Sequence, residues 1–279
     1  MKLVTYLSNG EEHVGVLTAD ESAVRPLPYA DMQAVIEAGA EALKPAGESI
    51  PRADVTLLAP IPRPRQDVIC LGINYRAHAE ESARYNKRDF VEAPVPIFFS
   101  KRVNEAVPPE GFIESHPGLV QRLDYEAELA VVIGKTAKNV PAEKAAEYIS
   151  GYTILNDVSA RVLQTAHKQW YFGKSLDGFT PMGPCIVTAD EIAFPPALAI
   201  RSRVNGEPRQ DSKTDLLLNS IAKIIETLTA GITLLPGTII ATGTPSGVGM
   251  GFDPPKFLKS GDVVECQIEG IGVLRNTVR

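Results

Sequence analysis

The sequence predicts an α+β protein that is mainly β. Its apolar residues gather in short extended runs bounded by glycine, proline and polar residues, which is typical of strands. The clearest helix is Leu216–Ala230, followed by Gly231 where a C-terminal cap belongs. Strands and helices do not alternate regularly, which argues against a Rossmann fold or a (β/α)₈ barrel. The strands predicted in the larger part of the chain are Asp67–Leu71, Ile97–Ser100, Tyr125–Ile133, Ile149–Asn156, Pro184–Val187, Ala199–Val204, Thr238–Thr242, Asp262–Ile268 and Gly272–Val278.

The N-terminal residues carry a smaller pattern of their own. Lys2–Leu7 and His13–Thr18 are extended runs on either side of a Ser-Asn-Gly turn, which predicts a hairpin, and Asp31–Leu43 follows as a helix. The segment Ala59–Asp67 contains three alternating prolines and favours a stiff connector. We therefore expect a small N-terminal α+β domain over residues 1–60 and a larger domain over residues 66–279.

Composition restricts the kind of protein and its partners. The formal net charge of −6 argues against a nucleic-acid backbone or an anionic membrane as the main partner. Cys70, Cys185 and Cys266 are far apart in sequence and form no metal-type pair, which fits reduced thiols. The N-terminus lacks a signal-peptide pattern, and no apolar run approaches the roughly 20 residues that span a bilayer. These features predict a soluble cytoplasmic protein.

Two carboxylates, Glu126 and Glu128, stand at the start of the apolar run DYEAELAVVIG (residues 124–134). In a strand, side chains two residues apart project from the same side, with Cα atoms roughly 6.5–7 Å apart. A hard divalent cation such as Mg²⁺ or Mn²⁺ would relieve their repulsion. The solvated face of a half-exposed strand explains the same alternation. Spacing alone therefore leaves both interpretations open.

Two further segments place polar residues after predicted strands. In GINYRAHAEE (residues 72–81), His78 and Glu81 would share one face of a helix, where the carboxylate could orient the imidazole as a general base. A solvated helix start with an incidental histidine is the plainer interpretation. Asp157 ends an apolar strand, and it either caps the following helix or supplies a third metal carboxylate.

Lys174 and a glycine-rich loop complete the candidates. Lys174 lies among aromatic residues and glycines in WYFGKSLDGFTPMGP (residues 170–184), so it either reaches water or holds an anion. The loop ATGTPSGVGMGF (residues 241–252) lacks the Gly-Lys-Ser/Thr ending of a P-loop. Its amides could approach an anion, although a plain turn accounts for most loops of this composition.

In their order along the chain, these segments resemble the fumarylacetoacetate hydrolase family, which includes acylpyruvases, oxaloacetate decarboxylases and hydroxymuconate-type isomerases. The matching motifs lie within residues 70 to 250 and cover nearly all of the larger predicted domain. They are GINYRAHAEE, DYEAELAVVIGK, GYTILNDVSARVLQ, WYFGKSLDGFTPMGP, VNGEPRQ and TGTPSGVG.

The resemblance implies a roll- or sandwich-like β catalytic domain that binds one Mg²⁺ or Mn²⁺ per chain. Carried over by motif, the metal ligands are Glu126, Glu128 and Asp157. Longer family members carry an additional aspartate ligand where this chain has Asn74. The resemblance therefore implies three protein carboxylates here instead of four.

The resemblance also implies catalytic and substrate-binding roles. His78 and Glu81 resemble the family's water-activating or proton-shuttling dyad, and Lys174 resembles its oxyanion-stabilising lysine. Gln164 and Thr244 fall where substrate contacts are expected. Two further cations, Arg76 and Lys101, are candidates to pair with substrate carboxylates.

The activity expected first is metal-dependent hydrolysis of a C–C bond in an acylpyruvate, through a pyruvate enolate. Isomerisation of a hydroxymuconate-type diacid and decarboxylation of oxaloacetate would use the same enolate, so they stay as alternatives. The non-enzymatic alternative is a protein that only binds a 2-oxo acid. The expected partners are this small 2-oxo acid and a second copy of the chain in a homodimer.

Overall fold

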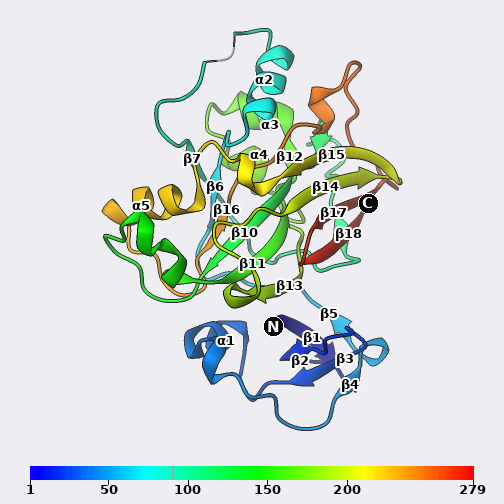
Figure 1. Ribbon diagram of the computed structural model, residues 1–279. Helices are drawn as coiled ribbons and strands as arrows, with labels where there is room; N and C mark the ends of the chain where they lie inside the picture. Colours follow the sequence, from blue (N-terminus) through cyan, green and yellow to red (C-terminus); the bar gives the residue numbers. More distant parts are fainter. Residues whose placement is uncertain (90) are drawn as a thin grey trace.

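The computed structural model describes residues 1–89 and 91–279, and it is mainly β, as the sequence predicts (Figure 1). The largest sheet has 11 strands. In spatial order these are β4 (Ile50–Pro51), β3 (Ala23–Pro26), β2 (Glu11–Leu17), β1 (Lys2–Ser8), β13 (Met182–Thr188), β11 (Ile149–Asn156), β10 (Ala127–Ile133), β16 (Ile239–Ala241), β6 (Val68–Leu71) and β7 (Phe98–Lys101), and β5 (Thr56–Leu57) pairs with β1. Neighbours in this sheet are antiparallel except for β16 and β6, which run parallel.

A second sheet of five strands packs on one face of the first. Its order is β15 (Glu207–Lys213), β14 (Ala199–Val204), β17 (Val263–Ile268), β18 (Gly272–Val278) and β8 (Phe112–Ile113), and β9 (Leu123–Asp124) and β12 (Ser159–Ala160) form a separate pair. Ile200 and Leu274 of the second sheet share a buried cluster with Leu129 of β10. The opposite face of β10, through Ala130 and Val132, lies in another buried cluster. Strand β10 is therefore covered on both faces.

The helices are short and surround the sheets. They are α1 (Met32–Ala38), α2 (Arg76–Tyr85), α3 (Arg161–Ala166), α4 (Tyr171–Lys174) and α5 (Ile221–Gly231), with 3₁₀ turns η1 (Ala40–Ala42), η2 (Arg52–Asp54), η3 (Ala142–Tyr148), η4 (Ala189–Glu191), η5 (Thr214–Leu216) and η6 (Gly249–Gly251). Helix α5 begins later than predicted because Ser220 caps it, accepting the Lys223 amide at 3.2 Å. Gly231 is the last helical residue, so its predicted place beyond the helix is wrong.

The N-terminal strands continue the large sheet. The predicted hairpin forms from β1 and β2, and β1 then pairs with β13 through Lys2 opposite Val187 and Leu3 opposite Ile186. In Figure 1 this part lies at the bottom of the view, below the larger body. A single buried cluster contains Leu3 and Ile36 of the N-terminal part together with Ile186 and others of the larger part. The division at residues 60–66 stays a prediction.

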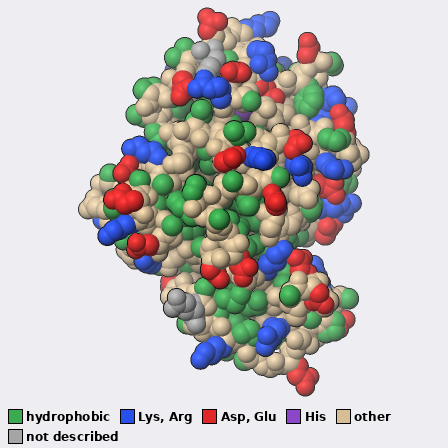
Figure 2. All heavy atoms as spheres, in the orientation of Figure 1, with side chains coloured by type: hydrophobic (Ala, Val, Ile, Leu, Met, Phe, Trp, Pro, Cys, Tyr) green, Lys and Arg blue, Asp and Glu red, His purple; other side chains and the backbone are tan. Residues whose placement is uncertain are grey.

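Among the described residues, no helix is long and apolar enough to cross a bilayer. Figure 2 shows acidic and basic side chains interspersed over the visible face. Cys70, Cys185 and Cys266 are all buried and unpaired with one another.

Candidate metal and catalytic site

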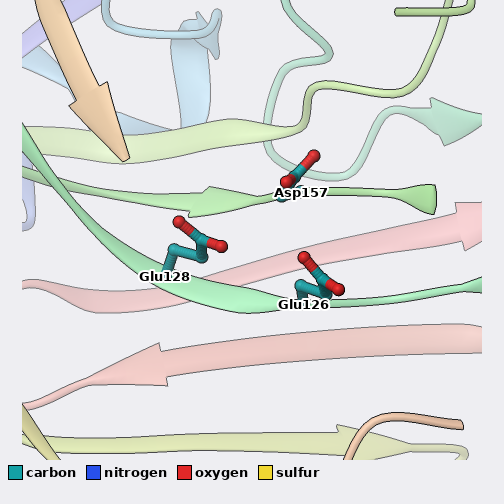
Figure 3. A group of neighbouring side chains, drawn as sticks. All are labelled: Glu126, Glu128 and Asp157. Atoms are coloured by element: carbon teal, nitrogen blue, oxygen red, sulfur yellow. The ribbon is translucent and has the colours of Figure 1, made fainter. Parts of the chain in front are cut away.

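Three carboxylates meet where β10 and β11 lie side by side (Figure 3). Glu128 belongs to β10, Glu126 directly precedes that strand, and Asp157 directly follows β11. Ala127 pairs with Asn156, and this register brings the two strand ends together. One carboxylate oxygen from each acid lies within 4.8 Å of the others.

The site is buried, so the interpretation of Glu126 and Glu128 as the wet face of a strand is wrong. The exposed fractions of Glu126, Glu128 and Asp157 are 5%, 1% and 0%. The cause is the cover on both faces of β10, which an alternating sequence pattern does not reveal. Strand β10 also begins later than predicted, at Ala127 instead of Tyr125. The Glu126 amide donates to the side-chain oxygen of Asn156 and not to the backbone of a neighbouring strand.

Basic side chains surround two of the three carboxylates. Lys174 Nζ lies 2.6 Å from both Glu126 Oε2 and Asp157 Oδ2. Arg161 Nη1 lies 2.7 Å from Glu126 Oε1, and Lys101 Nζ lies 2.8 Å from Asp157 Oδ1. Among the described contacts Glu128 has no cationic partner, and its Oε2 accepts the Gly243 amide at 2.8 Å.

This distribution of charge separates the acids by pKa. Burial, with Asp157 and Glu126 as negative neighbours, raises the pKa of Glu128 well above its ordinary value. Burial also opposes ionisation of Glu126, but Lys174 and Arg161 outweigh it and lower the pKa of that carboxyl. Glu128 is thus the acid whose charge lacks compensation. A divalent cation held by the three oxygens fits this site, because it would supply that charge and prefers oxygen ligands.

Asp157 is not the N-cap of the following helix. Helix α3 begins at Arg161 after Ala160, and no side-chain cap is formed there. The Asp157 carboxylate is directed to Lys101 and Lys174 instead.

Lys101 is fully buried beside Asp157, with its donors engaged by the protein. Its three donors are used by Asp157 Oδ1, the Val158 carbonyl at 3.1 Å and the Lys174 carbonyl at 2.6 Å. An ammonium group has three hydrogens, so none is left for a substrate carboxylate. The expected substrate contact through Lys101 is not supported by this position. The side chain instead fixes Asp157 and the end of α4.

The His78–Glu81 pair forms on α2 as its spacing predicts. His78 Nδ1 and Glu81 Oε2 are 3.1 Å apart, and both side chains are buried. The second Glu81 oxygen accepts the Gly247 amide at 2.9 Å, which ties α2 to the glycine-rich loop. An ionised carboxylate only accepts hydrogen bonds, so this arrangement leaves Nε2 as the basic nitrogen of His78.

A cavity of about 180 Å³ lies between His78 of the dyad and Glu126 of the three acids. Its lining includes His78, Glu126, Arg161, Gln164 and Lys174. A larger cavity of about 500 Å³ lies against the other face of α2, and none of these five residues lines it. Of the two cavities, the smaller one is therefore the one that reaches the acids, through Glu126.

Arg161 lines this cavity and carries a hydrogen-bond donor that is not used by the described residues. Its Nε lies 2.9 Å from Asp124 Oδ2, and its Nη1 also reaches Gln164 Oε1 at 3.2 Å. Its Nη2 is buried, and it has no hydrogen-bond partner among the residues that the structure describes. A buried guanidinium donor without a partner is costly, which suits an anionic ligand.

Two other predicted site residues, Thr244 and Arg76, make contacts within the protein that differ from those expected. The Thr244 hydroxyl is buried and donates to the Ala127 carbonyl at 2.9 Å, so a contact of that hydroxyl with substrate is not supported. Arg76 is exposed and pairs with Glu92 on the surface. Asn74, which stands where longer family members carry an additional aspartate ligand, is buried. Its side-chain amide is bonded to Thr242 and Asn219 and not to the acids, in keeping with the expected set of three carboxylates.

The glycine-rich loop holds protein carboxylates by its amides. Gly243 donates to Glu128, Gly247 to Glu81, and Gly249 and Met250 to Asp124. An added Cβ on Gly249 would lie 2.6 Å from Asp124 Oδ1. These amides are therefore engaged by side chains of the site and its support.

Three residues that contact the site were not among the predicted ones: Asp124 and Arg161, which pair with each other, and Gln210, which accepts the Ala127 amide. All three lie within motifs that carry the family resemblance, and that was the available signal. Asp124 alternates with Glu126 and Glu128 in DYEAE. Their partners lie far along the chain, as with Asp124 and Gly249, so spacing alone could not assign them.

Comparison with known proteins gives the site its context. Residues 67–279 match the family described as fumarylacetoacetate (FAA) hydrolase C-terminal, and residues 1–60 match Rv2993c-like, N-terminal. The chain is 47% identical over 226 residues to oxaloacetate tautomerase YisK of Bacillus subtilis, covering 81% of this chain and 74% of that one. It is 41% identical over 277 residues to the mitochondrial oxaloacetate tautomerase Fahd2a of Rattus norvegicus, covering 96% and 86%.

Solved structures share the architecture over the full length of the chain. The fumarylacetoacetate hydrolase of Exiguobacterium antarcticum superposes with a TM-score of 0.86 at 39% identity, covering 100% of this chain and 99% of that one. The 2-hydroxyhepta-2,4-diene-1,7-dioate isomerase of Mycobacterium marinum gives 0.81 at 35% identity, covering 100% and 98%. By sequence and by fold, the chain belongs to the fumarylacetoacetate hydrolase family.

Proposed function

We propose that the protein is a metal-dependent enzyme that interconverts the keto and enol forms of a small 2-oxo dicarboxylic acid, with oxaloacetate as the first candidate. The observation that carries this proposal is the buried triad of Glu126, Glu128 and Asp157. Its member Glu126 lines the same cavity as His78 and Lys174. The relatives named oxaloacetate tautomerases support tautomerisation over C–C hydrolysis.

Glu126, Glu128 and Asp157 would hold one Mg²⁺ or Mn²⁺, which supplies Lewis acidity and orients the 2-oxo acid when bound. Lys174 remains charged beside them: burial opposes the charge, but Asp157 and Glu126 outweigh it and raise the pKa of Lys174. A fixed ammonium group at this point stabilises negative charge that develops on the 2-oxo oxygen.

The proton moves through the dyad. His78 Nε2 takes a proton from the carbon next to the 2-oxo group, while Glu81 accepts the hydrogen bond from Nδ1 and stabilises the imidazolium. The C–H electron pair becomes the C=C bond, and the carbonyl π pair moves onto oxygen as an enolate. Return of the proton to that oxygen gives the enol, so no co-reactant is needed.

Arg161 and Gln164 would recognise a substrate carboxylate. The unpartnered Nη2 of Arg161 lies at the cavity that Gln164 also lines. The neighbouring ion pairs of Arg161 with Asp124 and Glu126 hold the guanidinium in place for a charged oxygen.

Hydrolysis of an acylpyruvate, the activity first expected from the sequence, is the second candidate. It is favoured by the same dyad, because an imidazole oriented by a carboxylate can activate water as well as remove a proton. Assembly as a homodimer is proposed on the family resemblance alone.

The test follows the ultraviolet absorbance of the enol form of oxaloacetate with purified protein, Mn²⁺ and a chelator. We expect faster keto–enol exchange that the chelator abolishes, without stoichiometric release of pyruvate or CO₂. Pyruvate release from an acylpyruvate, with no effect on oxaloacetate exchange, would favour hydrolysis and contradict the proposal. CO₂ release from oxaloacetate at the rate of turnover would favour decarboxylation.

Two substitutions separate binding from chemistry. Glu128→Gln should lose Mn²⁺ binding and activity together, whereas His78→Asn should bind Mn²⁺ normally and lose roughly 10²–10⁴-fold in kcat. The control is His13→Asn, because His13 lies on β2 and does not line the cavity. Normal Mn²⁺ binding by Glu128→Gln would show that the metal site is wrongly assigned.

A further inference from the structure

On one edge of strand β10, the neighbouring strand β16 ends short of the metal-binding acids. The ladder with β16 ends at Ala130 opposite Ala241. One position further, Thr242 donates to the Leu129 carbonyl through both its amide, at 3.0 Å, and its hydroxyl, at 2.8 Å. Beyond that point none of the described strands lies beside β10 on this edge, so other groups must satisfy the backbone there.

At Ala127, between the two glutamates, side chains take over the role of a strand. The Ala127 amide donates to Gln210 Oε1 at 3.1 Å, and the Ala127 carbonyl accepts the Thr244 hydroxyl at 2.9 Å. Gln210 Nε2 donates to Thr244 Oγ1 at 2.7 Å, which closes the ring. Thr244 and Gln210 are each 1% exposed, so water does not compete for these bonds.

The opposite edge is held at Glu126. Its amide donates to Asn156 Oδ1 at 3.0 Å, and its carbonyl accepts the Asp157 amide at 2.9 Å. Consecutive residues of an extended chain point their backbone groups to opposite edges. The peptide planes on both sides of Ala127 are therefore fixed from two directions. Those planes set where the side chains of Glu126 and Glu128 begin.

We propose that Thr244 is a positioning residue of the metal site. Supported by Gln210, it sets the separation of the Glu126 and Glu128 carboxylates through the peptide at Ala127. This inference rests on the metal site of the proposed function. In this inference, the Thr244 hydroxyl acts on the backbone segment that carries the metal ligands Glu126 and Glu128. Residues that hold metal ligands in place by hydrogen bonds commonly change the affinity of the protein for the metal by about 10–100-fold.

The experiment measures the Mn²⁺ dissociation constant from the signal of free Mn²⁺ in electron paramagnetic resonance. Thr244→Val, which keeps the shape and removes the hydroxyl, should weaken Mn²⁺ binding by about 10–100-fold. Thr244→Ser restores the hydroxyl and should bind close to wild type. Thr244→Ala, which removes the hydroxyl without bulk, should resemble Thr244→Val and is measured beside it in case the valine disturbs folding.

Thr242→Val is the matched control. It also removes a buried hydroxyl that donates to a β10 carbonyl, but the Leu129 carbonyl keeps the Thr242 amide as a donor. We expect its metal-free melting temperature to fall, as for Thr244→Val, while its Mn²⁺ affinity stays near wild type. Equal Mn²⁺ affinity of wild type, Thr244→Val and Thr244→Ala, or equal weakening in Thr242→Val, would overturn the inference alone. A wild-type protein that binds no Mn²⁺ would overturn the proposed metal site as well.

Discussion

Two buried lysines hold the two oxygens of Asp157, and they have different surroundings. Lys101 takes Oδ1 and Lys174 takes Oδ2. Lys174 lines the small cavity, whereas Lys101 donates its other hydrogens to backbone carbonyls. Burial lowers the pKa of Lys101 and is its largest influence, while the acids around Lys174 raise that residue's pKa despite burial. Only Lys174 is placed to act on a ligand.

Lys101→Met should destabilise the protein strongly although Lys101 does not line the cavity. The substitution leaves a buried carboxylate with one cation fewer and removes the Lys101 donor from two backbone carbonyls. Breaking a buried pair in this way typically costs about 3–5 kcal/mol of unfolding free energy. Urea denaturation measures the change. Lys223→Met, which removes an exposed pair with Glu226, is the control and should melt close to wild type.

A loss in Lys101→Met no greater than in the control would contradict the positioning role of Lys101. Mn²⁺ affinity gives an independent readout. The freed Asp157 should bind the ion more weakly, since its carboxylate loses one of the two groups that orient it.

At the scale of elements, local sequence patterns predicted most of the strands. Pairing between distant segments decided which strands lie side by side. The ranges of β11, β14 and β18 agree with the sequence because each is an extended run ended by turn or polar residues. Strand β15 was not predicted, since EPRQDSK is polar and gains its stability by pairing with β14. Local sequence does not reveal such pairing.

The same limit applies to the candidate site. The spacing of His78 and Glu81 predicted their contact, because three residues along a helix is a fixed distance. The destination of Lys101 was not predictable, because its partner lies 56 residues away in sequence. The glycine-rich loop was recognised, but the carboxylates that its amides hold come from two other segments, Glu81 from α2 and Asp124 and Glu128 from residues 124–134.

This loop tolerates little bulk at Gly249, and a substitution there tests its role. An added Cβ would lie 2.6 Å from both Asp124 Oδ1 and the Lys256 carbonyl, so backbone must move. Gly249→Ala should lower the free energy of unfolding by about 1–3 kcal/mol. It should also lower kcat/KM, because Asp124 holds Arg161 at the cavity.

Gly231→Ala is the control for that substitution. Gly231 ends α5, and an added Cβ there meets nothing within 4 Å. Alanine is the better helix former, so this variant should be as stable as wild type or slightly more stable. Denaturant unfolding of the two variants side by side makes the comparison. If Gly249→Ala were as stable and as active as Gly231→Ala, the loop would not have the rigid role described here.

At the scale of the whole molecule, the N-terminal part and the larger part share one sheet and one core. Strand β1 pairs with β13, and Gln33 of α1 donates to the Pro236 carbonyl at 2.8 Å. Ile36 of α1 lies in the same buried cluster as Val132 of β10. The strand that carries Glu128 is therefore packed, on one face, by the cluster to which the N-terminal part contributes.

We expect this shared core to make the chain unfold as one unit, and its single tryptophan tests this. Trp170 lines the cavity and packs edge-on against Phe99, so its fluorescence reports on the site and not on the N-terminal part. Ile36→Ala removes side-chain volume from a residue that is 1% exposed and should cost about 2–5 kcal/mol of unfolding free energy. If the core is shared, the midpoint of the Trp170 transition in urea shifts by the corresponding amount, whereas Val273→Ala, at an exposed position of β18, leaves it unchanged. An unmoved Trp170 transition, with an earlier loss of N-terminal structure, would mean that the two parts unfold independently despite the strand pairing that joins them.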